Sequence, residues 1–294
     1  MAGSADSLPG NRSPGAKLMM RTLWLRVLGC QVEVQCQDVE AWTLLMANYA
    51  PLQGALGGAE LRYTVGRLPG SSAFFLRREG QTARMAEDPG AFLFVFEHEL
   101  IVALQRRRRD LYFVHAAALE VAGTAFLLVG ASGHGKSTTT WALLHHGFRY
   151  FSDELSPVDL TTFVVYPYPH ALCLKAAPPG AYPLPQQTLT TARTLHIPTA
   201  ALPSAVGSGP APLGAIFFVH YCSRVARPAL RPMRKAEAAA HLLTHALNPL
   251  AHPADGLDGA IALTTRAACF ELLTADLPAT CAVVCTALRE LWHD

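Results

Sequence analysis

Hydrophobic and polar residues change their spacing repeatedly along residues 23–112. Alternation of apolar and polar residues predicts strands, and apolar residues three or four positions apart predict helices. On this basis we expect strands at residues 23–36, 59–68 and 72–80, and helices at residues 38–50 and 89–112. Together these elements predict a small α/β lobe.

The ends of the two predicted helices carry further signals. Asp38 is a suitable N-cap for the first helix, because its carboxylate can accept hydrogen bonds from the backbone N–H groups of the first turn. Four consecutive arginines, Arg106 to Arg109, end the second helix. We interpret them as charges that complement the helix dipole and solvate the surface, with contact to phosphate or an acidic partner as the alternative.

From residue 113 onward the pattern predicts buried strands that alternate with helices. Residues 113–123 and 124–130 predict two paired strands around a turn at Gly123, and residues 136–146 predict a helix. Further strands are expected at 148–154, within 155–175, at 214–221 and at 268–275, with helices at 235–247 and 277–292.

Two segments lack such a pattern. Residues 176–213 are rich in proline, and a stretch of this length without periodicity is uncommon in a compact domain unless it is a functional loop or disordered. The first residues are rich in Gly, Ser and Pro and predict a disordered tail. We therefore predict a tail at residues 1–16, an N-terminal α/β lobe at 17–112 and a second α/β domain at 113–294.

The composition is that of a globular protein, since 51% of the 294 residues are hydrophobic and 16% are charged. A net charge of +2 is too small to indicate binding to nucleic acid or to a membrane surface. No apolar run approaches the ~18 residues that a membrane span needs. The seven cysteines are odd in number and lie mostly among apolar residues, which favours reduced core residues over disulfides. We expect a cytoplasmic protein that binds neither nucleic acid nor membrane.

A phosphate-binding motif follows the strand predicted at 124–130. Gly130, Gly135, Lys136 and Ser137 fit the pattern G-x-x-x-x-G-K-[ST], with a strand before it and a helix after it. The glycines allow successive backbone N–H groups to point at an anion, and the helix N-terminus adds its dipole. This context favours a P-loop over a chance glycine-rich turn.

Roles for the loop residues follow from that chemistry. Lys136 would neutralise the β- and γ-phosphates of ATP, and the Ser137 hydroxyl would hold Mg²⁺. We expect the side chain of His134 to point to solvent. The residues expected to contact the nucleotide are Gly130, Ala131, Ser132, Gly133, His134, Gly135, Lys136, Ser137 and Thr138.

Two acids follow soon after the loop, at the end of the strand predicted at 148–154. If that strand is the parallel neighbour of the P-loop strand in a doubly wound sheet, Asp153 and Glu154 reach the edge that carries the loop. A carboxylate there can accept the proton of an attacking hydroxyl while its neighbour holds or orients Mg²⁺. Asp153 is the candidate base and Glu154 the candidate metal ligand; two surface acids at a strand end are the alternative.

Residues 113–154 resemble the catalytic core of HPr kinase/phosphorylase and its shorter bacterial relatives, the HPr-kinase-like proteins. The resemblance lies in His115 on the strand before the loop, the loop from Gly130 to Ser137, Gly147 at the helix end, and the acids Asp153 and Glu154. The spacing from Lys136 to Asp153 is similar to that of the family. The resemblance implies an α/β fold with a P-loop core like that of HPr kinase and phosphoenolpyruvate carboxykinase.

The resemblance also implies functions for individual residues. It implies Mg²⁺-dependent transfer of the ATP γ-phosphate to a serine hydroxyl, with Asp153 as the base and residues 113–294 as the catalytic domain. His115 becomes a residue of the catalytic site, with a buried structural histidine as the alternative. Lys175 becomes a candidate for phosphate or substrate contact, with a surface lysine as the alternative. Homo-oligomers are also implied.

The chain departs from the family in two places. The family has an Asp where this sequence has Glu154, which keeps a carboxylate one methylene longer. The Glu-Val-Arg-Gly-Leu-Gly segment of the family is missing after the acids, and the proline-rich residues 176–213 stand in its place. Recognition of the HPr phosphocarrier therefore does not follow.

The sequence as a whole predicts an ATP-dependent kinase. The favoured acceptor is a serine of a small protein or peptide, including a peptide natural product, since short relatives are associated with such pathways. A small-molecule kinase with the proline-rich segment as a lid is one alternative. A nucleotide-binding regulatory module without turnover is the other, and it gives no role to a base at Asp153.

Overall fold

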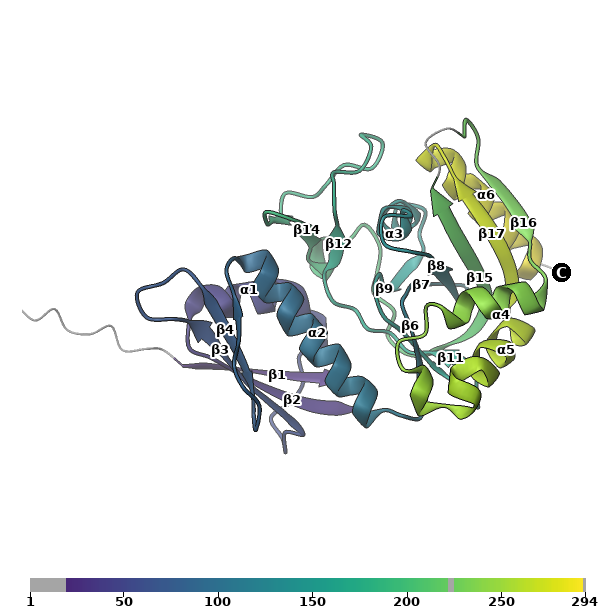
Figure 1. Cartoon of the computed structure of the whole chain (residues 1–294). Helices are drawn as coiled ribbons and strands as arrows, with labels where there is room; N and C mark the ends of the chain where they lie inside the picture. Colours follow the sequence, from purple (N-terminus) through teal and green to yellow (C-terminus); the bar gives the residue numbers. More distant parts are fainter. Residues whose placement is uncertain (1–19, 222–224, 293–294) are drawn as a thin grey trace, which may run out of the picture.

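The structure is a computed structural model that describes residues 20–221 and 225–292 and has a mixed α/β architecture. The tail predicted at residues 1–16 lies outside the described residues. Figure 1 shows a smaller N-terminal sheet with two helices beside a larger, curled sheet with helices on both faces. The predicted division at residues 112 and 113 stays a prediction.

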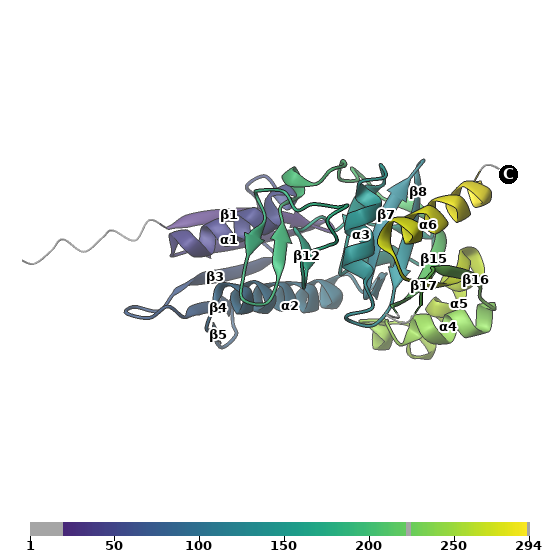
Figure 2. The same ribbon diagram turned by 90° about the horizontal axis from the view of Figure 1, so that it is seen from above.

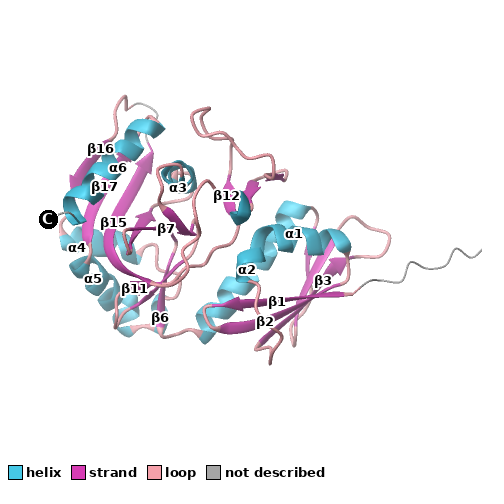
Figure 3. Ribbon diagram, turned by 180° about the vertical axis from the view of Figure 1, so that it is seen from behind, coloured by secondary structure: helices cyan, strands magenta, loops and turns pink. Residues whose placement is uncertain are grey.

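The N-terminal sheet has five strands in the order β1-β2-β3-β4-β5. Its elements are β1 (Arg21–Val27), β2 (Cys30–Cys36), α1 (Val39–Tyr49), β3 (Leu61–Arg67), β4 (Phe74–Arg78), β5 (Arg84–Ala86) and α2 (Pro89–Arg107). The apolar positions of β1 and β2 alternate with half-buried or exposed ones, so one face of the sheet carries the core. Both helices lie between this sheet and the rest of the chain (Figures 1 and 3).

The strand predicted at residues 23–36 is in fact a hairpin. The turn residues Leu28 and Gly29 have φ values of 50° and 84°, and β1 and β2 pair antiparallel on either side of them. A two-residue turn of this kind needs positive φ at both positions, which leucine rarely adopts. The sequence pattern alone therefore does not reveal the turn.

The predicted helix starts agree with the structure, but the second helix, predicted at residues 89–112, ends at Arg107, and Leu111 and Tyr112 belong to strand β6 (Leu111–Val114). The carboxylate of Asp38 accepts hydrogen bonds from the N–H groups of Glu40 and Ala41, each at 3.0 Å, at the start of α1. At the end of α2, Arg107 lies 3.4 Å from the Glu60 carboxylate. The first two arginines of the Arg106–Arg109 run lie in the last turn of the helix, as the dipole interpretation predicts.

The larger sheet has nine strands. Seven lie in the order β6-β10-β11-β15-β8-β7-β9, and β17 joins β15 to β16. Its strands are β6 (Leu111–Val114), β7 (Ala116–Val121), β8 (Thr124–Val129), β9 (Arg149–Ser152), β10 (Ser156–Asp159), β11 (Val164–Val165), β15 (Ala211–Tyr221), β16 (Ala229–Pro232) and β17 (Ala268–Thr274).

Helices cover both faces of this sheet, as Figures 1 and 2 show. They are α3 (Lys136–Leu144), α4 (Lys235–Leu243), α5 (Leu257–Arg266) and α6 (Leu277–Trp292). The side chains of β8 divide between the faces, because Phe126 and Leu128 pack with α3 and α6 whereas Leu127 and Val129 pack with α4 and α5. The pattern did not predict α5 or β16.

One feature of the sheet differs from the prediction. The strand that ends in the two acids, β9, is separated from the P-loop strand β8 by β7, which pairs antiparallel with both. Because two antiparallel steps restore the direction, β9 still points the same way as β8. Ala118 pairs with Leu127 on one side and with Ser152 on the other, so the two strands end at a similar level.

The proline-rich residues 176–213 are folded rather than extended as a simple loop. They contribute β13 (Leu189–Thr190) and β14 (Leu195–Ile197), which form a three-stranded sheet with β12 (Leu172–Leu174). The segment also contacts α3, because the Trp141 indole N–H donates a hydrogen bond to the Tyr182 carbonyl at 3.0 Å. None of the helices in the described part of the chain is both long and apolar enough to cross a membrane.

Candidate active site

The predicted phosphate loop connects β8 to α3, and its backbone requires glycine at particular positions. Gly133 and Gly135 have φ values of 88° and 89°, in the left-handed region that glycine favours. At position 130 a side chain would not fit, because a Cβ atom there would lie 2.7 Å from the Val219 carbonyl oxygen of β15. Gly135 precedes the first residue of α3, so the loop curls directly into the helix N-terminus.

The Lys136 side chain folds back over this loop. Its ammonium donates hydrogen bonds to the carbonyl oxygens of Gly130 at 2.7 Å and Ala131 at 3.4 Å, and the residue is 6% exposed. Burial lowers the pKa of Lys136, while the charges of Glu154 and Asp153 act in the opposite direction. This effect of both acids on Lys136 agrees with the course of β8 and β9, which run in the same direction and end at a similar level.

Other loop residues are more open. Ala131, Ser132 and Gly133 are exposed, and Ser137 and Thr138 are half-buried in the first turn of α3. Lys175, which follows β12, donates a hydrogen bond to the Ser132 hydroxyl. The structure thus brings the predicted substrate-contacting lysine to the phosphate loop.

The expectation for His134 is wrong. Its side chain is half-buried instead of pointing to solvent: Nδ1 lies 3.3 Å from the Val219 carbonyl oxygen, and the ring centroid is 5.4 Å from that of His220. The loop passes so close to the end of β15 that this side chain packs against the strand.

Asp153 is 1% exposed and is held by three neighbours. Its Oδ1 accepts a hydrogen bond from the Tyr150 hydroxyl at 2.7 Å, and its Oδ2 accepts one from the Cys173 N–H at 2.9 Å. The Nε2 atom of His170 lies 3.3 Å from Oδ1. Burial raises the pKa of Asp153, although the charge of His170 opposes this.

Glu154 has a different environment. Its side chain is 48% exposed, and its Oε1 lies 3.0 Å from Nε2 of His115. Burial acts to raise the pKa of Glu154, but the hydrogen bond and charge of His115, together with the charge of Lys136, leave this pKa below its usual value. The structure therefore places His115 beside the second acid.

Three contacts of Asp153 were not predicted. Tyr150 and Cys173 belong to segments predicted as strands, and His170 lies in the Tyr-Pro-Tyr-Pro-His segment before β12. His170 is 2% exposed, and its Nε2 also lies 3.3 Å from Oε1 of Glu97, on helix α2. The position of His170 between a proline and a strand is only a weak indication of a functional residue. Nothing in the sequence connects His170 with Glu97 on an earlier helix.

The residues present fit a nucleotide and Mg²⁺. The loop offers backbone N–H groups, a lysine and a helix N-terminus to phosphate oxygens. A serine hydroxyl at Ser137 and the half-exposed carboxylate of Glu154 are oxygen donors of the kind Mg²⁺ prefers, and Mg²⁺ commonly takes only one or two carboxylates beside phosphates and water. Bound Mg²⁺ would neutralise charge on the phosphates.

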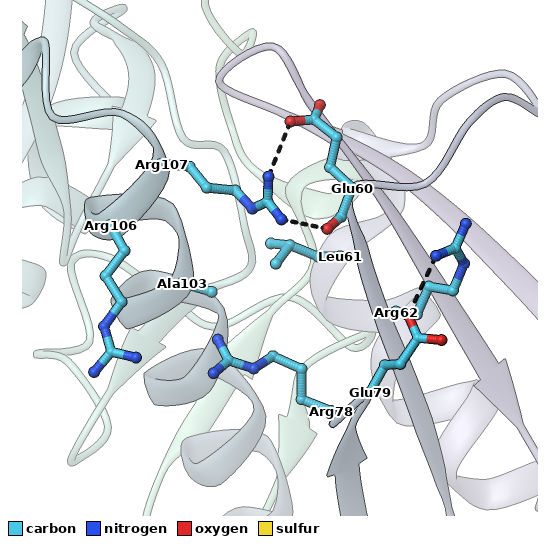
Figure 4. Close-up of a pocket in the computed structure, with 8 residues that line it drawn as sticks. All are labelled: Glu60, Leu61, Arg62, Arg78, Glu79, Ala103, Arg106 and Arg107. Atoms are coloured by element: carbon cyan, nitrogen blue, oxygen red, sulfur yellow. Dashed lines mark hydrogen bonds and ion pairs between the residues drawn. The ribbon is translucent and has the colours of Figure 1, made fainter. Parts of the chain in front are cut away.

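A surface cavity of about 430 Å³ lies in another part of the molecule (Figure 4). Its lining residues come from β3, β4, the segment before β3 and the end of α2: Glu60, Leu61, Arg62, Arg78, Glu79, Ala103, Arg106 and Arg107. It includes neither the phosphate loop nor the two acids. We place the candidate site at the loop because the chemically distinctive groups are there.

Comparison with known proteins finds similarity among solved structures alone. No family model matches the chain, and no curated protein matches it. A solved structure described as the HPr(Ser) kinase/phosphatase from Coxiella burnetii is similar over 60% of this chain and 94% of that chain, with 11% sequence identity and a TM-score of 0.31. At this distance the similarity carries no inference about activity.

Proposed function

We propose that the chain is an ATP-dependent kinase that transfers the γ-phosphate to a serine hydroxyl of a small protein or peptide. The observation that carries the proposal is that Asp153 and Glu154 follow β9, which runs in the same direction as β8 and ends at a similar level, while Lys136 lies on the loop that follows β8. A loop that only binds nucleotide does not need two carboxylates beside its lysine. A phosphoryl-transfer site uses both, one to accept the proton of the attacking hydroxyl and the other to hold Mg²⁺.

In this proposal the hydroxyl oxygen attacks the γ-phosphorus, the bond from that phosphorus to the β–γ bridging oxygen breaks, and ADP leaves. Asp153 accepts the hydroxyl proton. Lys136 and the N–H groups of the loop bind the phosphates, and Lys175 adds a positive charge beside Ser132. Ser137 and Glu154 would hold Mg²⁺, and His115 orients the Glu154 carboxylate.

The different exposure of the two acids supports these separate roles. Glu154 faces solvent, where a metal with its water ligands has room, whereas Asp153 is shielded from water. Shielding favours a base that must take its proton from the acceptor and not from solvent. In this proposal the acceptor hydroxyl contacts Asp153 in the substrate complex, where catalytic contacts often first form.

The test is incubation of the purified chain with γ-labelled ATP, Mg²⁺ and a fractionated lysate of its own source, together with any acceptor encoded nearby. A labelled protein or peptide formed by the unaltered chain and not by Asp153→Asn supports the proposal. A label found only on a small molecule favours the small-molecule kinase. ATP binding without any labelled product favours the regulatory module.

A further inference from the structure

A buried group of charges connects the N-terminal sheet to the candidate base. Glu97 lies on α2, and its side chain is 20% exposed. Nε2 of His170 lies 3.3 Å from Oε1 of Glu97 and 3.3 Å from Oδ1 of Asp153. The imidazole therefore contacts two carboxylates, one from helix α2 beside the N-terminal sheet and one from the residue that follows β9 of the larger sheet.

If this arrangement had only a structural role, it would lower the free energy of unfolding relative to apolar side chains at the same positions. Burying ionisable groups costs free energy unless they are paired and hydrogen-bonded, and apolar side chains of similar size often stabilise a fold as well or better. The single Nε2–H of His170 lies near two acceptors. It forms no well-aligned hydrogen bond with either of them or with any other group in the described part of the chain. The Oε1 atom of Glu97 is likewise buried without a well-formed hydrogen bond among the described residues.

Helix α1 holds the same segment from a second direction. The carbonyl oxygen of Asn48 accepts a hydrogen bond from the Ala171 N–H at 2.7 Å, and the Asn48 side chain lies 2.8 Å from Nδ1 of His196 on β14. Ala171 is two residues before Cys173, whose N–H holds Asp153. Both helices of the N-terminal sheet thus contact the short segment that fixes the candidate base.

The apolar core of the N-terminal sheet also extends to residues beside Asp153 and His170. The hydrophobic cluster of the N-terminal sheet includes Leu155, two residues after Asp153, and Tyr168, two residues before His170. The ring centroid of Tyr168 lies 5.1 Å from that of His170, and the ring centroid of Tyr49 on α1 lies 6.4 Å from it. The position of Asp153 is therefore coupled to the packing of this sheet.

We propose that Glu97 and His170 are positioning residues for Asp153, so that helix α2 of the N-terminal sheet forms part of the phosphoryl-transfer site. The inference rests on the proposed function of Asp153. The charged imidazole of His170 lies beside Oδ1 and the Cys173 N–H donates a hydrogen bond to Oδ2, so these two contacts fix the orientation of the carboxylate. Glu97 contacts the same Nε2 atom and helps to hold the imidazole beside Asp153.

The first experiment compares Glu97→Gln and His170→Gln with a matched control on the same helix. Glu99→Gln removes a carboxylate two residues away that pairs with Arg84 at 2.8 Å and has no contact with His170. We expect kcat to fall about 10- to 100-fold in the first two variants, the scale for a misplaced catalytic group, with the KM for ATP nearly unchanged. Glu99→Gln should retain the kcat of the unaltered chain.

Combining variants separates positioning from general destabilisation. On the Asp153→Asn background, Glu97→Gln should cause no further loss of kcat, because its effect acts through that carboxylate. The inference would be overturned if the double variant had a lower kcat than Asp153→Asn alone, by the factor that Glu97→Gln shows by itself. It would also be overturned if Glu97→Gln had the same kcat as the Glu99→Gln control.

A second measurement does not depend on activity. In ¹⁵N-histidine NMR of the full chain, the His170 signal is assigned by its loss in His170→Gln. It should shift in both Glu97→Gln and Asp153→Asn and stay in place in Glu99→Gln. A signal that moves in neither variant would overturn the network even if the chain is a kinase. Shifts as expected in a chain that phosphorylates nothing would refute the proposed function while leaving these contacts in place.

Discussion

Replacing Asp153 by asparagine removes the proposed base with little change in shape. The amide keeps one oxygen and turns the other into an NH₂ group. Because the Cys173 N–H needs an acceptor at 2.9 Å, the remaining oxygen should stay on that side. The NH₂ group then faces the Tyr150 hydroxyl, which can rotate to accept, and the imidazole of His170, which loses its ion pair.

The expected cost to folding follows from these contacts. Breaking a buried ion pair by removing one partner can cost ~3–5 kcal/mol. Here burial itself opposes the charge of Asp153 and raises its pKa, so neutralising the side chain recovers part of that cost. We expect a loss of about 1–3 kcal/mol in the free energy of unfolding, which leaves the chain folded below its transition temperature.

The expected cost to catalysis is larger. Loss of a general base lowers the rate of transfer ~100-fold or more, which corresponds to about 2.7 kcal/mol in the activation barrier. ATP affinity should change little, because Asp153 is buried and is not among the residues proposed to bind the phosphates. Single-turnover transfer from labelled ATP, beside calorimetric titration with nucleotide, separates the two quantities.

A matched control is Glu154→Gln, which removes the neighbouring carboxylate. It should raise the Mg²⁺ concentration needed for half-maximal transfer and recover much of the rate at high Mg²⁺, since its role is metal support. The assignment of the base is refuted if Asp153→Asn transfers phosphate at nearly the normal rate. It is also refuted if the Glu154 variant has the larger loss at saturating Mg²⁺.

Three further predictions concern the loop. Lys136→Ala should weaken ATP binding and turnover together, as calorimetry and the transfer assay would show, and unchanged ATP affinity would contradict its role. Gly130→Ala should lower the melting temperature and ATP affinity, because its Cβ would lie 2.7 Å from the Val219 carbonyl oxygen; an unaltered melting curve would contradict this clash. Lys175→Ala should raise the KM for ATP or acceptor several-fold with a smaller change in kcat, and equal kinetic constants would make its contact with Ser132 incidental.

The local part of the site was predictable from the sequence. Gly130, Lys136 and Ser137 belong to one short segment whose spacing carries its own geometry, and strand, loop and helix follow in the expected order. The N-cap at Asp38 was predictable for the same reason, since a cap depends only on its own helix. Such features need no knowledge of the rest of the fold.

Features that depend on distant contacts were not predictable. The strand β7 lies between β8 and β9, and an alternating or apolar pattern does not specify which strand pairs with which. Glu97 and His170 are 73 positions apart, and only tertiary packing brings them to Asp153. The turn at Leu28 was missed because leucine there adopts a conformation that its propensity disfavours.

The most direct test of the central claim is ³¹P NMR of the unaltered chain with ATP, Mg²⁺ and the acceptor-containing lysate fraction. The account predicts that ADP resonances and a new phosphomonoester resonance grow together, and that neither grows at a comparable rate with Asp153→Asn. Growth of ADP with inorganic phosphate alone would show hydrolysis without transfer. That result, or equal phosphomonoester formation by the variant, would contradict a kinase that uses Asp153 as its base.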